Sequence, residues 1–534
     1  MKTTPAADLI LTDGIVHTLD PALGTVQAIA IADGRIIHAG TTDGMRSFAG
    51  ADTEILPLQG RVLLPGLIDA HLHLEQLAFS AKEVDCSTST LEECISRVGT
   101  QCRLAPEGTW ILGHGWDQNN WSASPDHWSL DRVSFGHPVY LTAKSLHAGW
   151  ANSRALSLAG LDHGTADPPD GSLQRDGQGD LTGILTEGAM MLISRALPKP
   201  GIEETAAALE ACQESLWAHG LTAVHDFDGP TCFQALQLLK ERGRLAIRVL
   251  KSLPLESLDA AATLGMRSGF GDEWLRIGAI KVFADGALGP RTAAMLSPYE
   301  GEPQNCGRCL HDRESLFDIG RQAFTAGFAL AVHAIGDRAN HETLAAFEAL
   351  RRDPSAAPQP AMASRIEHVQ LLHPDDLPAL ARLGVIASMQ PIHATSDMRA
   401  ADRYWGARTK MSYAWRSLET AGATLAFGSD APVESPNPFW GLHAAVTRRS
   451  REGLPATDGW IPEQRLSRES ALRAYTAAPA ALAGSSGQQG VLRRGAHADL
   501  ILLDEDPLTC PEDRLHALRP RATMVAGIWR YRDF

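Results

Sequence analysis

The chain has 534 residues, of which 44% are hydrophobic and 21% are charged, so it is not a largely disordered protein. Its formal net charge is −15, from 48 Lys and Arg against 63 Asp and Glu. A chain this acidic, without a basic run, is a poor candidate for binding nucleic acid or an anionic membrane. The first residues lack the apolar core of a signal peptide, and no apolar run reaches the ~20 residues of a membrane helix. Because eight cysteines are also too few for a disulfide framework, we expect a cytoplasmic protein.

Both ends of the chain predict short β-strands. Asp13-Gly14 and Asp33-Gly34 each separate two apolar runs, which favours hairpins. The run Ala-Asp-Leu-Ile-Leu occurs at 7–11 and again at 498–502. Because chain ends lie close together in many folds, we expect one small β-sandwich domain built from residues 1–62 and 486–534.

The central part of the chain predicts a (β/α)8 TIM barrel over residues 63–485. Apolar strand-like runs alternate there with helical stretches, as parallel βα units do. The eight candidate strands are 66–73, 220–225, 246–253, 277–283, 329–333, 365–369, 385–390 and 424–430. The gap after the first run is too long for one crossover, so we expect a long insertion at about 80–215 that lies over the barrel mouth.

The first candidate strand of the barrel carries a histidine pair. Side chains two residues apart share one face of a strand, so Asp69, His71 and His73 point the same way. At the carboxyl end of a barrel strand that face is the catalytic mouth. Two imidazoles placed there are natural ligands for zinc and similar metals. A half-exposed strand with two unremarkable histidines is the alternative.

Further candidate ligands lie near other predicted strand ends. His333 ends the fifth run, His368 lies in the sixth, and Asp430 ends the eighth. Each of them alone is more often a satisfied polar group than a ligand. Four histidines and an aspartate converging on one barrel mouth favour a site for a divalent metal, most simply zinc, with one or two ions per chain.

Lys281 stands in the apolar run Ile-Lys-Val-Phe of the fourth candidate strand, in a chain that has only eight lysines. Burial of an ammonium is costly and lowers its pKa, which frees the neutral amine. A neutral amine can take up carbon dioxide and become a carbamate, a two-oxygen anion able to bridge two metals. Pairing of Lys281 with a local carboxylate such as Asp285 is the alternative.

Together these motifs resemble the amidohydrolase superfamily over nearly the whole chain. Within it, 281–289 (Lys-Val-Phe-Ala-Asp-Gly-Ala-Leu-Gly), 115–117 (Gly-Trp-Asp), 147–152 (His-Ala-Gly-Trp-Ala-Asn) and 182–185 (Thr-Gly-Ile-Leu) resemble the branch that contains N-substituted formamide deformylases. The resemblance implies that His71, His73 and Asp430 hold one metal, and that His333 and His368 hold a second. It also implies that carbamylated Lys281 bridges them, and that Asp430 carries a proton from the attacking water to the leaving amine.

Five residues are candidates for contacting substrate: Arg291, His147, Trp116, Asp117 and His225. Arg291 could clamp a carboxylate or pair with a local acid. Core packing is the alternative for Trp116, and a turn or cap role is the alternative for Asp117. The insertion is rich in tryptophan, at 110, 116, 121, 128 and 150, which favours a wall for an apolar group of the substrate.

The sequence therefore predicts a metal-dependent hydrolase that cleaves a non-peptide C–N bond of a small N-substituted amide or N-acyl compound. An isomerase, epimerase or lyase on the same barrel is the second reading, since the fold does not distinguish them. A binding protein that has lost catalysis is disfavoured because the ligand set is complete. The expected partner is a small molecule, and the sequence leaves open whether the chain forms a homo-oligomer.

Overall fold

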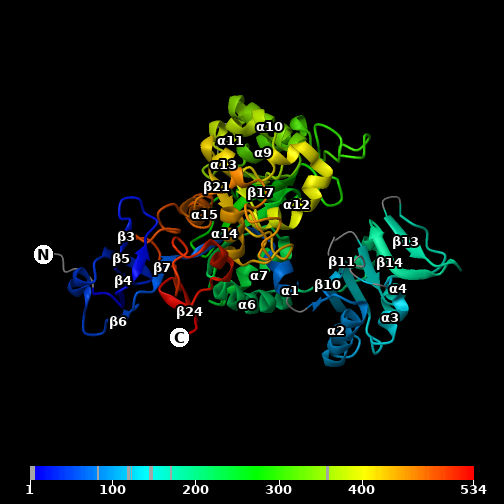
Figure 1. The fold of residues 1–534 in the computed structure, drawn as a ribbon, viewed down its shortest axis with the longest axis horizontal. Helices are drawn as coiled ribbons and strands as arrows, with labels where there is room; N and C mark the ends of the chain where they lie inside the picture. The colour runs from blue at the N-terminus through cyan, green and yellow to red at the C-terminus, as the bar shows by residue number, and fades with distance from the viewer. Residues whose placement is uncertain are drawn as a thin grey trace. The chain divides into compact units, whose positions relative to one another are not determined.

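The computed structural model describes residues 6–80, 83–116, 121, 123–143, 148–168, 171–356 and 360–534. The chain divides into two compact units, Met1–Leu77 with Ile202–Phe534, and Ala78–Gly201 (Figure 1). Within the described ranges, no helix is both long and apolar enough to cross a bilayer.

The larger unit contains a barrel of eight strands that are all parallel to their neighbours. In chain order they are β8 (Leu67–Leu72), β15 (Leu221–Asp226), β16 (Arg248–Pro254), β17 (Leu275–Phe283), β18 (Leu330–Ala334), β19 (Arg365–His368), β20 (Ile386–Met389) and β21 (Leu425–Phe427). Neighbours in the sheet follow this order, and a parallel bridge between Leu72 and Ala431 links its two edges. The predicted (β/α)8 barrel is therefore confirmed. Its strands read as continuous apolar runs because helices cover them outside and side chains fill the interior.

Helices separate the barrel strands and surround them in Figure 1. They are α1 (Leu74–Ser80), α6 (Ile202–Ala218), α7 (Pro230–Glu241), α8 (Leu258–Thr263), α9 (Arg313–Thr325), α10 (Asp337–Arg352), α11 (Leu377–Leu383), α12 (Pro391–Trp405), α13 (Trp415–Thr420), α14 (Pro438–Thr447), α15 (Arg468–Ala474) and α16 (Ala477–Leu482). The end of α11 shows how the sequence sets a boundary. Gly384 adopts the left-handed conformation there, with φ of 68°, and β20 begins two residues later.

Two further sheets of the larger unit come from the chain ends. One has the order β5-β4-β1-β6 and the other the order β24-β23-β22-β7-β2-β3. Their strands are β1 (Leu9–Thr12), β2 (Ile15–His17), β3 (Thr25–Val26), β4 (Ala28–Ala32), β5 (Arg35–Gly40), β6 (Glu54–Pro57), β7 (Val62–Pro65), β22 (Leu500–Leu503), β23 (Ala522–Val525) and β24 (Ile528–Arg532). Strand β22 pairs antiparallel with β7, so both ends of the chain share one sheet. Leu9 and Ile31 of the first sheet belong to the same apolar cluster as Leu500 and Met524 of the second.

The two Asp-Gly turns behave differently. Asp33-Gly34 joins β4 to β5 in an antiparallel hairpin, as expected. Asp13-Gly14 does not form a hairpin, because β1 and β2 lie in different sheets. Strand β1 already pairs with β4 on one side and β6 on the other, so it has no free edge for β2.

The smaller unit contains a six-stranded mixed sheet with the order β13-β14-β12-β11-β10-β9. Its elements are β9 (Val84–Asp85), α2 (Leu91–Leu104), β10 (Ile111–Trp116), α3 (His127–Asp131), β11 (Val139–Ala143), β12 (Ala148–Ala151), α4 (Ser153–Leu158), β13 (Gly171–Arg175), β14 (Leu181–Glu187) and α5 (Met190–Ser194). Trp116, Trp121 and Trp150 are buried against one another in its core, with each pair of rings 6.1 Å apart.

Candidate metal centre

The predicted ligands lie near the carboxyl ends of the barrel strands. His71 is the next-to-last residue of β8, His333 is the next-to-last of β18, and His368 is the last of β19. Lys281 lies two residues before the end of β17, and Asp430 follows β21 by three residues. Because all eight strands are parallel, these positions meet at one end of the barrel.

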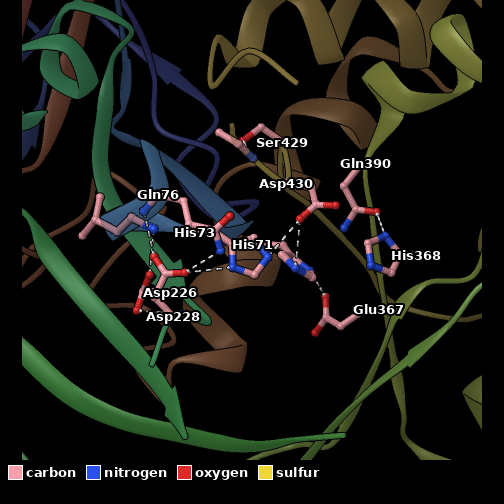
Figure 2. Close-up of polar contacts among 12 residues, drawn as sticks. His71, His73, Gln76, Asp226, Asp228, Glu367, His368, Gln390, Ser429 and Asp430 are labelled. Atoms are coloured by element: carbon pink, nitrogen blue, oxygen red, sulfur yellow. Dashed lines mark hydrogen bonds and ion pairs between the residues drawn. The ribbon is translucent and has the colours of Figure 1, made fainter. Parts of the chain in front are cut away.

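His71, His368 and Asp430 come close enough to share one ion. One ligand atom from each lies within 4.8 Å of the other two, and all three residues are buried. His71 Nε2 lies 3.3 Å from Asp430 Oδ1, and His73 Nε2 lies 3.4 Å from the same oxygen (Figure 2). His71, near the end of strand β8, and His73, the residue after it, therefore face one carboxylate oxygen.

Oxygen acceptors at Nδ1 orient the imidazole rings of His71 and His73. Glu367 Oε2 lies 2.7 Å from Nδ1 of His71, and Asp228 Oδ1 lies 3.1 Å from Nδ1 of His73. Holding Nδ1 in this way leaves Nε2 of each ring directed at Asp430.

A third acceptor, on Gln390 between β20 and α12, holds His368. Its Oε1 lies 2.8 Å from Nδ1 of His368. These three acceptors come from separate elements of the barrel, as Figure 2 shows. Such supporting hydrogen bonds are typical of metal-ligating histidines.

The protonation states of this cluster fit a cation. Burial, and then the positive charge of Lys281, lower the pKa of His71 to about 4. Burial opposes ionisation of Asp430, but His71 and His73 keep its pKa well below the usual range. At neutral pH the lone pair of His71 Nε2 thus faces a carboxylate, and this buried nitrogen has no hydrogen-bond partner among the described residues. Two acceptors facing each other need a cation between them, and a set of nitrogen and oxygen donors suits a transition metal.

His73 differs from His71 in its protonation state. Burial would lower its pKa, but hydrogen bonds to Asp228 and Asp430 outweigh burial and raise the pKa to about 10. Without a metal this ring is therefore protonated and neutralises part of the surrounding negative charge. A metal bound at its Nε2 would displace that proton.

Lys281 is buried near His71 and lies over two aromatic rings. Its Nζ is 4.5 Å from the ring centroid of Phe227 and 4.9 Å from that of Phe283. Burial lowers its pKa to about 8, although Glu367 and Asp430 act in the opposite direction. The neutral amine is therefore a minor but accessible form near neutral pH.

Asp285 is not the partner of Lys281. Its two oxygens accept the backbone N–H groups of Ala294, Ile335 and Gly336, at 2.8–3.0 Å. Burial raises the pKa of Asp285 to about 7, against these three hydrogen bonds. The carboxylate thus organises the loops after β17 and β18, and the local-pairing alternative for the lysine is not observed.

His333 lies beside the cluster but is turned differently. Its ring centroid is 4.5 Å from that of His368, whereas its Nε2 lies 2.9 Å from the carbonyl oxygen of Gly286. Burial, followed by the charge of Lys281, lowers the pKa of His333 to about 3. The ring is therefore neutral and close to the other ligands, but its Nε2 does not point at Asp430.

A second group of close acidic side chains contains Asp226, Asp228 and Cys232. Lys251 Nζ lies 2.6 Å from Asp226 Oδ2, so a protein cation already pairs with one of the two carboxylates. Asp228 holds His73, as described above. This group therefore supports the candidate metal centre rather than forming another one.

The predicted substrate contacts are placed less favourably than the ligands. Arg291 Nε forms an ion pair of 2.9 Å with Glu302, and the guanidinium covers the ring of Tyr404. This matches pairing with a local acid. His225 is buried inside the barrel, where its Nδ1 lies 3.0 Å from Arg365.

The prediction that Trp116 contacts the substrate needs correction. It is 1% exposed, its indole Nε1–H donates to the carbonyl of Leu141, and its neighbours in the core are Trp121 and Trp150. Core packing therefore explains this residue better than substrate contact. Five tryptophans were predicted to form a substrate wall. Three of them, Trp116, Trp121 and Trp150, are packed in the core of the smaller unit instead. The remaining two candidates, Asp117 and His147, lie outside the described residues.

The residues that orient the ligands are not among those predicted from the sequence. Glu367 immediately precedes His368 in the strand, and Gln390 ends the seventh predicted strand, so strand position alone could have drawn attention to both. His393 was also missed. It follows that strand by three residues, and its Nε2 lies 3.9 Å from Asp430 Oδ2.

Comparisons with known proteins agree with this geometry. The model of the amidohydrolase family matches residues 54–531. A putative amidohydrolase of Bacillus subtilis, YtcJ, is 31% identical over 96% of this chain and 97% of its own. An N-substituted formamide deformylase of Arthrobacter pascens is 29% identical over 99% of both chains. The crystal structure of an uncharacterised metal-dependent hydrolase from Pyrococcus furiosus covers 94% of this chain and all of its own, with a TM-score of 0.78 and 30% identity.

The chain therefore belongs to the amidohydrolase family. The resemblance to the branch with N-substituted formamide deformylases is confirmed over the full length of the chain.

Proposed function

We propose that the protein hydrolyses the amide C–N bond of a small, non-peptide N-acyl or N-formyl compound. The observation that carries the proposal is the buried arrangement of His71 and Asp430, where a neutral imidazole nitrogen faces a carboxylate at 3.3 Å. The family and the relative named as a formamide deformylase support the bond type.

A divalent metal, most simply zinc, would be held by His71, His73, His368 and Asp430. Bound there, it would polarise the carbonyl group and lower the pKa of a bound water. His333 lies near enough to contribute to a second ion after a change of ring orientation. Lys281, whose pKa is lowered to about 8, would react as the free amine with carbon dioxide and release one proton, and its carbamate would supply two further oxygen ligands.

Asp430 would carry the reacting proton. Its carboxylate takes a proton from the attacking water as the water oxygen bonds to the carbonyl carbon. It then gives that proton to the nitrogen as the C–N bond breaks, which releases a carboxylic acid and an amine. Glu367, Asp228 and Gln390 keep the imidazoles in the orientation that this site needs.

The test combines metal analysis with a substrate panel. Protein purified without chelator is expected to carry about one equivalent or more of transition metal. It is then offered N-benzylformamide, N-acetyl aromatic amino acids and a cyclic ureide in ¹⁸O-labelled water. We expect an amine and a carboxylate that contains the label. Conversion without incorporation of label would show an isomerase or lyase instead, and metal-free protein with full activity would refute the metal site.

A further inference from the structure

His393 lies next to the candidate metal centre but is not among the ligands derived above. It belongs to the first turn of α12, which follows β20, and its side chain is almost completely buried. Its backbone N–H donates to the carbonyl of Gln390, the residue that holds His368. The His393 ring is nearly parallel to that of His368, with 6.2 Å between centroids and 14° between planes. One short segment thus positions both histidines.

The two oxygens of Asp430 face different groups. Oδ1 faces Nε2 of His71 and of His73, at 3.3 and 3.4 Å. Oδ2 faces Nε2 of His393 at 3.9 Å, which is too long for a hydrogen bond. Asp430 can therefore contribute to a metal site through one oxygen and present the other toward His393.

The Nε2 atom of His393 is also buried without a hydrogen-bond partner in the part of the chain that the structure describes. Leaving such an atom unsatisfied destabilises the folded protein, so a site that keeps one is expected to use it for a ligand. The neighbouring carboxylate oxygen places this unsatisfied nitrogen where the reacting amide must approach the base.

We propose that His393 is a further catalytic residue, whose Nε2–H donates a hydrogen bond to the carbonyl oxygen of the scissile amide. The inference rests on the proposed amide hydrolysis. As water attacks the carbonyl carbon, negative charge develops on that oxygen, and the hydrogen bond from His393 becomes stronger. The proton removed from water goes to Asp430 and then to the leaving nitrogen, and His393 keeps its own proton throughout. Loss of one such donor typically lowers kcat by about 10²–10³-fold.

Two substitutions separate the hydrogen bond from the shape of the ring. His393→Phe keeps a flat ring against His368 but removes the donor. His393→Gln places an amide N–H near the position of the original Nε2. We expect His393→Phe to lower kcat about 100-fold with little change in KM, and His393→Gln to recover part of that loss. His443→Phe on α14 is the matched control, because His443 is equally buried but contacts His516 instead. Its kcat is expected to equal that of the wild type.

Metal content of each variant, measured by elemental analysis, shows whether His393 acts on the metal or on the substrate. We expect His393→Phe to retain the wild-type amount. A loss of metal that parallels the loss of activity would make His393 a ligand and overturn the proposal. Unchanged kcat in His393→Phe would overturn it as well.

Binding of a tetrahedral phosphonamidate, measured by calorimetry, tests the same contact without turnover. Its oxygens resemble the charged carbonyl oxygen of the transition state. We expect at least tenfold weaker binding to metal-loaded His393→Phe than to the wild type, with partial recovery in His393→Gln. If the wild type binds the phosphonamidate but hydrolyses no amide, the proposed function fails while the contact of His393 is still measured. Equal affinity of the wild type and His393→Phe, or no binding to the wild type, would refute the inference.

Discussion

Buried charge at the amino-terminal end of the barrel can be compared with buried charge at the carboxyl end. At the amino-terminal end, Arg248 begins β16 and is almost fully buried. Its Nε and Nη2 donate to the two oxygens of Asp499, at 2.7 and 3.1 Å, and its Nη1 donates to the carbonyl of Glu273. Oδ1 of Asp499 also accepts the backbone N–H of Ala526. Each oxygen of this carboxylate thus has a donor, and the pair ties the barrel to the terminal sheets.

At the carboxyl end, buried polar atoms are left without partners. Three such atoms have no hydrogen bond among the described residues: the Nε2 atoms of His71, Gln390 and His393. A folded chain that only needed stability would have paired these atoms or replaced them with apolar groups. The difference separates a structural ion pair from a site whose partners come from outside the chain.

The largest effect is expected from Lys281→Arg at the carboxyl end. A guanidinium keeps the positive charge but cannot become a carbamate, so the variant should lose bound metal and lose activity below detection. Lys281→Ala should also lose metal and activity if the oxygens of the Lys281 carbamate hold the metal. The measurement is metal content together with turnover. Near-wild-type turnover of the arginine variant would show that Lys281 does not act as a carbamate.

A substitution at the amino-terminal end of the barrel should lower the stability of the protein but not its activity. Asp499→Ala leaves Arg248 as a buried cation without its partner, so we expect the free energy of unfolding to fall by about 3–5 kcal/mol. The kcat and metal content of the protein that remains folded should be those of the wild type. Chemical denaturation followed by circular dichroism measures the first quantity. Reduced kcat in fully folded Asp499→Ala would mean that the two ends of the barrel are coupled.

Asp430→Asn should produce the opposite pattern. The amide keeps the shape of the side chain but removes the base, so kcat should fall by roughly 10²-fold or more. Folding should be affected less than in Asp499→Ala, because His73 keeps its second acceptor, Asp228, when Asp430 loses its charge. Turnover and thermal unfolding of the metal-loaded variant are compared. Full activity with intact metal would assign the base to another residue, with His147 as the first alternative.

The barrel itself was predictable because its strands are buried on both faces. Each of the eight apolar runs became a strand within a few residues of its expected bounds. Position along a strand also placed His71, His333 and Asp430 at the same end of the barrel. The alternation of apolar runs and helical stretches carried this information without any knowledge of distant contacts.

Details that depend on contacts between distant parts of the chain were not predictable. Glu367 turns the ring of His71 from a position 296 residues further along the chain. The orientation of His333 toward Gly286 likewise depends on the path of a loop. Similarly, tryptophans in the insertion indicate a need to bury aromatic surface, but not whether substrate or protein buries it. Trp116 and Trp150 are buried by their own unit.

The smallest effect is expected from Gln390→Leu, which changes the orientation of a ligand without removing it. Leucine nearly preserves the side-chain volume but leaves Nδ1–H of His368 without its acceptor at 2.8 Å. Loss of such a supporting hydrogen bond typically weakens metal binding by 10–100-fold. Competition with a chelator measures this affinity, and Gln390→Glu is the matched control because it retains an oxygen acceptor. Wild-type affinity in Gln390→Leu would show that packing alone orients His368.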